Sequence, residues 1–172
     1  MKIESIVVGE LEENCYILSI DNKCLVIDPG AEASRIIDKI GDKEVLGILV
    51  THHHFDHVGV LHEIVNEYDA NCYAFNNLKE KKYNIGPFKF DVIYNPGHTN
   101  DSISFYFKED NVMFVGDFVF KGSVGRCDLG GNELDMKKSI NKLKEFKENI
   151  TLYPGHGDKT SLDDEKKYNP FF

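Results

Sequence analysis

The sequence predicts an α/β protein in which β-sheets are covered by helices. Short apolar runs typical of strands alternate with segments whose apolar residues recur at helical spacing. Neighbouring strand-like runs are joined by short turns, and a Pro-Gly pair stands at the end of three of them. Elements in this order bury their apolar faces by packing sheets against helices.

The first half of the chain contains the following predicted elements. Strands at 14–20 and 23–28 flank a hairpin turn at Asp21-Asn22. A short helix at 33–40 precedes a buried strand at 45–50. A helix at 58–69 leads into a strand at 71–75. Strands and helices therefore alternate along this half.

The second half continues the alternation. Strands are predicted at 90–95, 102–107 and 111–117. The clearest amphipathic helix is predicted at 132–149, with Leu134, Ile140, Leu143 and Phe146 expected on one side. A strand at 150–155 and a short helix at 162–168 complete the chain.

Size and composition indicate one globular domain spanning residues 1–172. Hydrophobic residues make up 41% and charged residues 28% of the sequence, as in ordinary soluble proteins. The net charge of −9 and the lack of a basic stripe disfavour a nucleic-acid partner. No apolar run is long enough to span a bilayer, and glutamates interrupt the N-terminal region where a signal peptide needs an apolar core. Four dispersed cysteines without a CxxC pair are expected to be reduced, so we expect a cytoplasmic protein without a membrane partner.

The segment LVTHHHFDHVG, residues 49–59, concentrates four histidines and an aspartate. In an extended chain alternate side chains share a side, so His52, His54 and Asp56 point one way. His57 leaves this alternation as the chain turns into the following helix. One loop thus directs two imidazoles to one point and a carboxylate with an imidazole to a second. Imidazole and carboxylate ligands suit zinc, iron and similar metals.

Other interpretations of the histidine run are weaker. A surface run or a tag remnant does not fit a position in mid-chain directly after a buried strand. His53 and His57 have the spacing of a helical zinc motif, but that motif needs Glu directly after the first histidine, where His54 stands. His53 is expected to face away from the metal side, and His62 falls on the next helix.

Three more candidate ligands occur later in the chain. His98 and His156 each follow a Pro-Gly turn, which projects the next side chain from the rim of a sheet. Asp117 ends a strongly apolar strand, where an unpaired carboxylate is costly and a bound cation compensates it. The alternative for Asp117 is a helix or turn cap.

The ordered motifs THHHFDH, PGHT, GDFVF and YPGHG resemble those of the metallo-β-lactamase superfamily. The segment GSVGRCDLGG and the ending TSLDDEKKYNPFF are similar to the small bacterial members of the glyoxalase II-like group, the hydroxyacylglutathione hydrolases. This resemblance implies an αββα sandwich, with two mixed sheets flanked by helices and a metal site at one edge. It further implies two sets of metal ligands bridged by Asp117: His52, His54 and His98 for the first metal, and Asp56, His57 and His156 for the second.

The resemblance also implies a function, that of a binuclear metal-dependent hydrolase of a small thioester. A metal-bound hydroxide would attack the acyl carbon, with Asp56 as a catalytic residue that orients or deprotonates the nucleophile. Two divalent ions are expected as cofactors, zinc first, with iron or manganese as alternatives. Arg126 is a candidate for binding a substrate carboxylate, or else a surface partner of Asp128. Asp28 and Thr51 are expected to fix the ligand loops.

Several questions stay open at this stage. Full-length glyoxalase II enzymes carry a C-terminal helical substrate domain that we do not expect in this protein, so recognition of glutathione does not follow. A mononuclear iron persulfide dioxygenase and a lactone or other ester hydrolase are alternative functions, while a purely structural metal site is disfavoured because such sites are closed by four protein ligands. Asp101 stands where relatives often have glycine. The expected partner is a small-molecule substrate, and the oligomeric state is not indicated.

Overall fold

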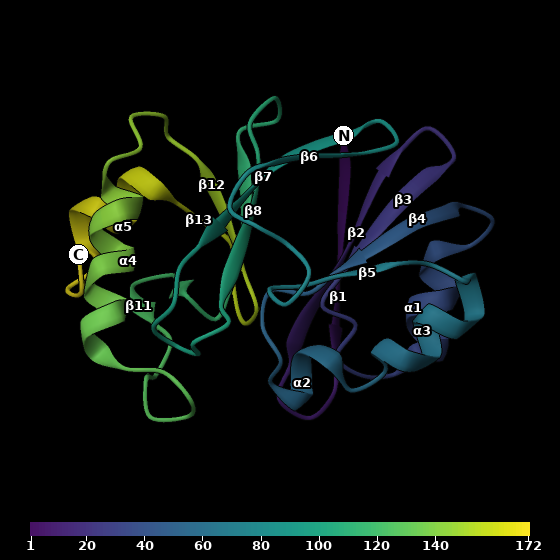
Figure 1. The fold of residues 1–172 in the computed structure, drawn as a ribbon, viewed down its shortest axis with the longest axis horizontal. Helices are drawn as coiled ribbons and strands as arrows, with labels where there is room; N and C mark the ends of the chain where they lie inside the picture. Colours follow the sequence, from purple (N-terminus) through teal and green to yellow (C-terminus); the bar gives the residue numbers. More distant parts are fainter.

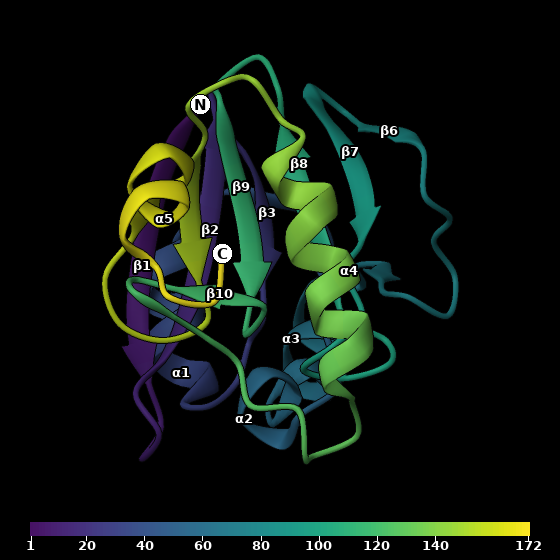
Figure 2. The same ribbon diagram turned by 90° about the vertical axis from the view of Figure 1, so that its left-hand side faces the viewer.

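Two β-sheets face each other, and helices cover the outer face of each. The computed structural model describes residues 1–172. Helices α1 (Ala33–Ile40) and α3 (Leu61–Tyr68) lie outside one sheet, and α4 (Glu133–Lys144) and α5 (Leu162–Tyr168) lie outside the other (Figure 1; Figure 2). A one-turn helix, α2 (Phe55–Val58), lies below both sheets in the view of Figure 1. The αββα sandwich expected from the motifs is confirmed.

The first sheet has the strand order β1-β2-β3-β4-β5. Its strands are β1 (Lys2–Val8), β2 (Glu13–Ile20), β3 (Lys23–Ile27), β4 (Glu44–Leu49) and β5 (Cys72–Tyr73). β1, β2 and β3 pair antiparallel, whereas β3–β4 and β4–β5 are parallel, so the sheet is mixed. Asp21 adopts a left-handed conformation between β2 and β3, which confirms the predicted hairpin turn.

The second sheet has the order β13-β12-β9-β8-β7-β6. Its strands are β6 (Lys82–Ile85), β7 (Phe88–Tyr94), β8 (Ile103–Phe107), β9 (Val112–Gly116), β12 (Thr151–Pro154) and β13 (Thr160–Ser161). Only β9 and β12 pair in parallel, and the other neighbours are antiparallel. A small hairpin of β10 (Val119–Phe120) and β11 (Ser123–Val124) follows β9.

Three apolar clusters hold these layers together. The central cluster lies between the sheets and contains Leu25, Leu49 and Phe114. A second cluster packs the first sheet against α1 and α3, and a third packs the other sheet against α4 and α5. β2 is buried on both faces, with Ile17 in the helix-side cluster and Leu18 in the central one, which explains its unbroken apolar sequence.

Helix α4 differs from the prediction in its buried face. Leu134 is 71% exposed, while Met136, Ile140 and Leu143 are buried. At 100° per residue, Leu134 lies half a turn away from Leu143, whereas Met136 and Ile140 are four residues apart and share a side. The expected position of Leu134 was therefore wrong, and Phe146 lies beyond the end of the helix, half-buried against the third cluster.

The other differences concern short or polar elements. The helix predicted at 58–69 corresponds to α3, which begins only at Leu61, because Val58 ends the one-turn helix α2 and Gly59 and Val60 separate the two. Strands β1, β6, β10, β11 and β13 were not predicted. β1 and β6 carry many charged or polar residues, and the remaining three have two residues each. None of the helices is long and apolar enough to cross a membrane.

Candidate metal centre

The candidate ligands come from four places in the fold that converge at one edge of the sandwich. The chain leaves β4 at Leu49, and His52 and His54 follow in an irregular segment before α2. Helix α2 carries Asp56 and His57. The remaining three follow strands of the second sheet: His98 after β7, Asp117 after β9 and His156 after β12.

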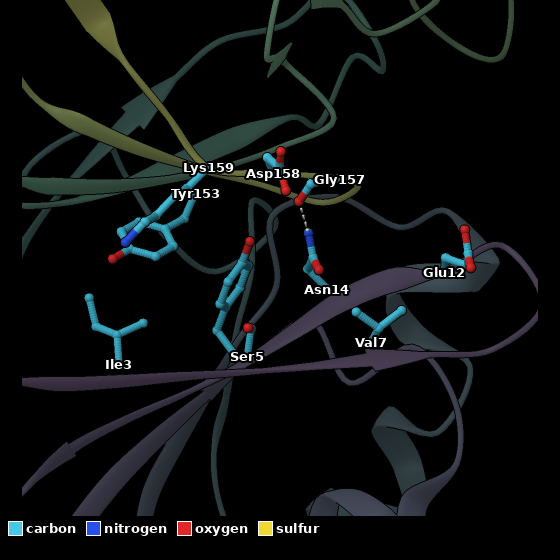
Figure 3. A pocket seen from close by; sticks show the side chains of 10 residues that line it. Ile3, Ser5, Val7, Glu12, Asn14, Tyr153, Gly157, Asp158 and Lys159 are labelled. Carbon is cyan, nitrogen blue, oxygen red and sulfur yellow. Dashed lines mark hydrogen bonds between the residues drawn. The ribbon is translucent and has the colours of Figure 1, made fainter.

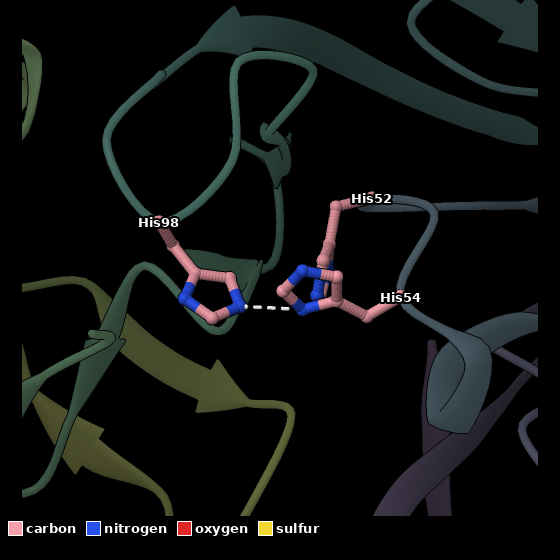
Figure 4. Close-up of side chains that lie close together, drawn as sticks. All are labelled: His52, His54 and His98. Carbon is pink, nitrogen blue, oxygen red and sulfur yellow. Dashed lines mark hydrogen bonds between the residues drawn. The ribbon is translucent and has the colours of Figure 1, made fainter. Parts of the chain in front are cut away.

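The first group of converging atoms belongs to His52, His54 and His98, whose ligand atoms lie within 4.8 Å of one another. Figure 4 shows the three imidazoles, two from the segment after β4 and one from the loop after β7. His98 Nε2 lies 2.9 Å from His54 Nδ1. His52 and His98 are buried. Three nitrogens thus meet at one point near the protein surface.

The second group consists of Asp56, His57 and His156, again with ligand atoms within 4.8 Å. His156 Nε2 lies 3.1 Å from Asp56 Oδ2, and His57 Nε2 lies 3.8 Å from the same oxygen. His57 is fully buried, whereas Asp56 and His156 are partly exposed. This group therefore borders solvent.

Asp117 lies between the two groups. Its carboxylate oxygens are 3.2 Å from His57 Nε2, 3.5 Å from His98 Nε2 and 3.6 Å from His156 Nε2. One of these nitrogens belongs to the first group and two to the second. The structure therefore brings all seven predicted ligands together, with Asp117 in a bridging position.

The two remaining histidines lie outside the centre. His53 is exposed and forms a close pair with Asp101. This pair joins the segment after β4 to the loop after β7. His62 lies on α3 and is hydrogen-bonded to Asn66.

Three of the converging imidazoles are held by backbone carbonyls through their other nitrogen. His54 Nε2 lies 2.9 Å from the carbonyl oxygen of Leu129, and His98 Nδ1 lies 2.7 Å from that of Arg126. His156 Nδ1 lies 2.9 Å from the carbonyl oxygen of Leu11. A carbonyl can only accept, so these nitrogens carry the proton and the opposite nitrogens are left with a free lone pair.

The other two imidazoles are held by side chains. His57 Nδ1 lies 3.0 Å from Asp28 Oδ2, and His52 Nδ1 lies 3.1 Å from Thr51 Oγ1. Asp28 also accepts hydrogen bonds from the backbone N–H of Thr51 at 2.8 Å and from its hydroxyl at 2.6 Å. Asp28 and Thr51 therefore form one buried network that orients both rings, as expected from the sequence.

The charge state of the centre follows from burial and from these contacts. Burial lowers the pKa of His52 and of His98, so both imidazoles are neutral near pH 7. Burial also disfavours the charged form of His57, but the nearby carboxylates of Asp117, 3.2 Å from Nε2, and of Asp28, 3.0 Å from Nδ1, outweigh it and raise the His57 pKa. Burial likewise opposes ionisation of Asp117, yet the contact with His57 prevails and lowers the pKa of that carboxyl. Without a cation, a proton on His57 balances the carboxylates.

Three buried atoms at the centre test whether a metal fits. His52 Nε2, His57 Nε2 and Asp117 Oδ1 have no hydrogen-bond partner in the protein. Leaving such atoms unsatisfied costs about 1–3 kcal/mol each. A cation placed among them would take their lone pairs, and imidazole nitrogen with carboxylate oxygen is a donor set for zinc, iron or manganese. The residues present therefore fit a metal.

Glycine provides the space for this arrangement. A Cβ on Gly155 would lie 2.3 Å from Asp117 Oδ1 and 2.4 Å from His57 Cε1, so no larger residue fits between Pro154 and His156. Gly116 has a φ of +51°, and a Cβ there would lie 2.3 Å from Thr51 Oγ1. The glycines preceding His156 and Asp117 are thus required by the close approach of these loops to the centre.

Sequence reasoning missed one residue of the centre, Glu13. Its side chain is buried, neither carboxyl oxygen has a hydrogen-bond partner, and Oε1 lies 3.8 Å from His57 Nδ1. Burial raises the pKa of Glu13 to about 10, so the carboxyl is neutral in the metal-free protein. The only sequence signal was a glutamate directly before the buried run of β2.

Arg126 contacts the first ligand group only through its backbone, and its side chain pairs with Asp128. Its backbone carbonyl accepts the hydrogen bond from His98, while its guanidinium makes two 2.6 Å hydrogen bonds to Asp128. The side chain is 64% exposed. This is the surface pairing considered as the alternative role for Arg126.

A large cavity lies next to the centre without containing any candidate ligand. It measures about 540 Å³ and opens between β1 and the segment after β12 (Figure 3). Asn14 lies in its wall and donates hydrogen bonds to the carbonyls of Pro154 and Gly157. These bonds hold the turn that carries His156, so the cavity wall helps to position this candidate ligand.

Comparison with known proteins identifies the family of this chain. The model of the metallo-beta-lactamase superfamily matches residues 8–90 and 83–156. The chain belongs to the metallo-β-lactamase superfamily.

Relatives of this superfamily cover the whole chain. A probable metallo-hydrolase, YqgX of Bacillus subtilis, is 34% identical, and the alignment covers 99% of this chain and 97% of that protein. The hydroxyacylglutathione hydrolase GloC of Haemophilus influenzae is 30% identical over 99% of this chain and 98% of its own. The crystal structure of TTHA1623 in a di-iron-bound form superposes with a TM-score of 0.91 at 30% identity, covering 98% of this chain and 100% of that one. The chain is thus similar to metallo-hydrolases over its full length.

Proposed function

We propose that this protein is a binuclear metal-dependent hydrolase of a small thioester. The observation that carries the proposal is the pair of ligand groups, His52/His54/His98 and Asp56/His57/His156, with Asp117 within 3.6 Å of both. Two adjacent sites bridged by a carboxylate are the arrangement of two-metal hydrolases. The similarity to GloC, named a hydroxyacylglutathione hydrolase, supports the bond type, because an acylglutathione is a thioester.

The chemistry divides between the cofactors and the chain. Two bound divalent cations, zinc in our proposal, with iron or manganese as alternatives, would acidify a water and polarise the acyl carbonyl. The oxygen of water forms a bond to the acyl carbon, the carbon–sulfur bond breaks with its electron pair on sulfur, and the products are a carboxylic acid and a thiol. Thiolate is a good leaving group, so its departure requires no additional acid group.

Asp56 is the residue proposed to act on the nucleophile. Its Oδ2 borders solvent and lies 3.1 Å from His156 Nε2, so the carboxylate is held at the open side of the centre. There it orients the attacking water and accepts its proton. Arg126 is proposed to bind a carboxylate on the thiol carrier, which requires its guanidinium to exchange Asp128 for the substrate.

The test is metal content followed by a substrate panel. We expect about two metals per chain by elemental mass spectrometry on protein purified without chelator, and hydrolysis of thioesters by that protein. His52→Ala should lose metal and activity, whereas His62→Ala, which removes a histidine outside the centre, should lose neither. One iron per chain with oxygen uptake on a persulfide would replace the proposal with a persulfide dioxygenase. Hydrolysis of lactones but not thioesters would replace the substrate class.

A further inference from the structure

A second cavity borders the candidate metal centre directly. It measures about 470 Å³, within the size range of small-molecule sites, and lies between the β1–β2 turn, the loop before α1, and α2. Asp56 is one of its lining residues. A substrate bound at the centre therefore has a neighbouring space on the side of the second ligand group.

Two large apolar side chains stand exposed in this cavity. Leu11 is 53% exposed and Phe55 is 74% exposed, although both side chains favour burial. Single exposed apolar residues are common on protein surfaces, but two that share a cavity with a candidate catalytic carboxylate are typical of a binding site. Val8, Ala31 and Val60 extend the apolar lining.

The backbone fixes both side chains relative to the centre. The carbonyl of Leu11 lies 2.9 Å from His156 Nδ1. Phe55 stands between His54 and Asp56, at the first position of α2, where the His57 N–H donates to the His54 carbonyl. The cavity and the ligands are thus held by shared segments of chain, and the apolar surface does not move independently of the centre.

Charge decides which part of a substrate this cavity suits. The charged residues in its lining are Glu10, Glu32 and Asp56, and none is basic. The guanidinium of Arg35 bonds to Glu32 at 2.6 Å, but Arg35 is not part of the lining. A carboxylate or phosphate would meet only negative charge here, whereas an apolar chain would cover Leu11 and Phe55.

We propose that this cavity binds the acyl chain of the substrate and makes the enzyme selective for thioesters of apolar acids. The inference rests on the proposed thioesterase function and adds the substrate class to it. Longer saturated acyl chains should be hydrolysed with higher kcat/KM than acetyl, because each buried methylene strengthens binding. Hydroxylated or carboxylated acyl groups gain nothing from this surface.

The first experiment compares acetyl, butyryl and hexanoyl thioesters of N-acetylcysteamine. In the unmodified protein kcat/KM should rise with chain length, by up to about fourfold for each methylene that becomes fully buried. In Leu11→Ala/Phe55→Ala the ratio of hexanoyl to acetyl should fall at least tenfold. Leu134→Ala, which removes a leucine on α4 that is even more exposed than Leu11, should leave the ratio unchanged. Equal kcat/KM for acetyl and hexanoyl in the unmodified protein would overturn the proposal.

The second experiment reports binding without hydrolysis. Methyl resonances of Leu11 and Val60 should shift and saturate on titration with hexanamide, should respond far less to acetamide, and should not shift in Phe55→Ala. These shifts without any thioester hydrolysis would support the cavity and reject the thioesterase function. Thioester hydrolysis without these shifts would support the function and reject the cavity as acyl site.

Discussion

Replacing Asp28 by asparagine tests how the protein sets the proton on His57. Asp28 accepts hydrogen bonds from the Thr51 N–H at 2.8 Å, from the Thr51 hydroxyl at 2.6 Å and from His57 Nδ1 at 3.0 Å. An asparagine of the same shape keeps one oxygen for the Thr51 N–H. Its NH₂ group then takes the place of Oδ2, the oxygen that accepts from both His57 and the Thr51 hydroxyl, and it can only donate.

The consequence reaches the metal centre through the imidazole. To accept from the new NH₂ group, His57 Nδ1 must be without a proton, so the neutral ring carries its proton on Nε2, the atom that lies 3.2 Å from Asp117 Oδ1. That atom then has no lone pair for a metal. We expect a loss of about 1.5–3 kcal/mol in the free energy of unfolding from the lost hydrogen bond to a charged group. Metal affinity at the second group should fall about 10–100-fold, the usual effect of removing a partner that orients a metal ligand.

The assay is metal affinity by chelator competition, with urea unfolding measured in parallel. Asp21→Asn is the matched control, because Asp21 is also left-handed but lies exposed in the β2–β3 turn. Asp28→Asn should remain folded and retain less metal than the control. Full metal affinity in Asp28→Asn would refute the reasoning that Asp28 sets the His57 proton.

Three further predictions concern burial, space and packing. In the metal-free folded protein the pKa of Glu13 is about 10, whereas in the unfolded chain it is about 4.5. Between these pH values the folded state binds one more proton than the unfolded state, so the free energy of unfolding falls as pH rises. Urea unfolding at pH 5 and pH 9 should show a smaller fall in Glu13→Gln than in the unmodified protein. Gly155→Ala should lower metal affinity at least tenfold in chelator competition, because its Cβ would occupy the space of Asp117 and His57. Unchanged metal affinity would contradict the close packing of Gly155 against these two side chains. Phe114→Ala should cost about 3–5 kcal/mol of unfolding free energy in urea, because this fully buried ring packs on Tyr16 and Tyr153, and a loss below about 1 kcal/mol would contradict that packing.

The sequence predicts the metal ligands better than it predicts the contacts that hold these ligands in place. The ligands were predictable because Pro-Gly turns project the histidines that follow them, and because a carboxylate at the end of an apolar strand is costly unless a cation compensates it. The segment after β4 is irregular in the structure, yet His52 and His54 still face the centre and His53 faces out, so alternation gave the right sides. The predicted position of Leu134 was wrong because, at 100° per residue, Leu134 lies half a turn away from the buried Leu143.

Supporting contacts were less accessible to sequence reasoning. Glu13 comes from a strand far from the histidines in sequence, and only the folded sheet places it beside His57. The acceptors for His54, His98 and His156 are backbone carbonyls, and a carbonyl has no sequence signature because every residue has one. Strand β6 was missed because its side chains alternate between exposed and half-buried positions, which leaves no apolar run.

These backbone acceptors have a consequence for how the protein can change. Leu11, Arg126 and Leu129 orient ligand histidines through main-chain oxygens, so their side chains are free to vary without altering the bonds that hold the rings. Leu11 is at the same time part of the surface proposed to contact the acyl chain. Mutation at such positions can therefore retune substrate preference while the metal ligands stay in place, which lets one reaction centre serve many substrates over evolutionary time.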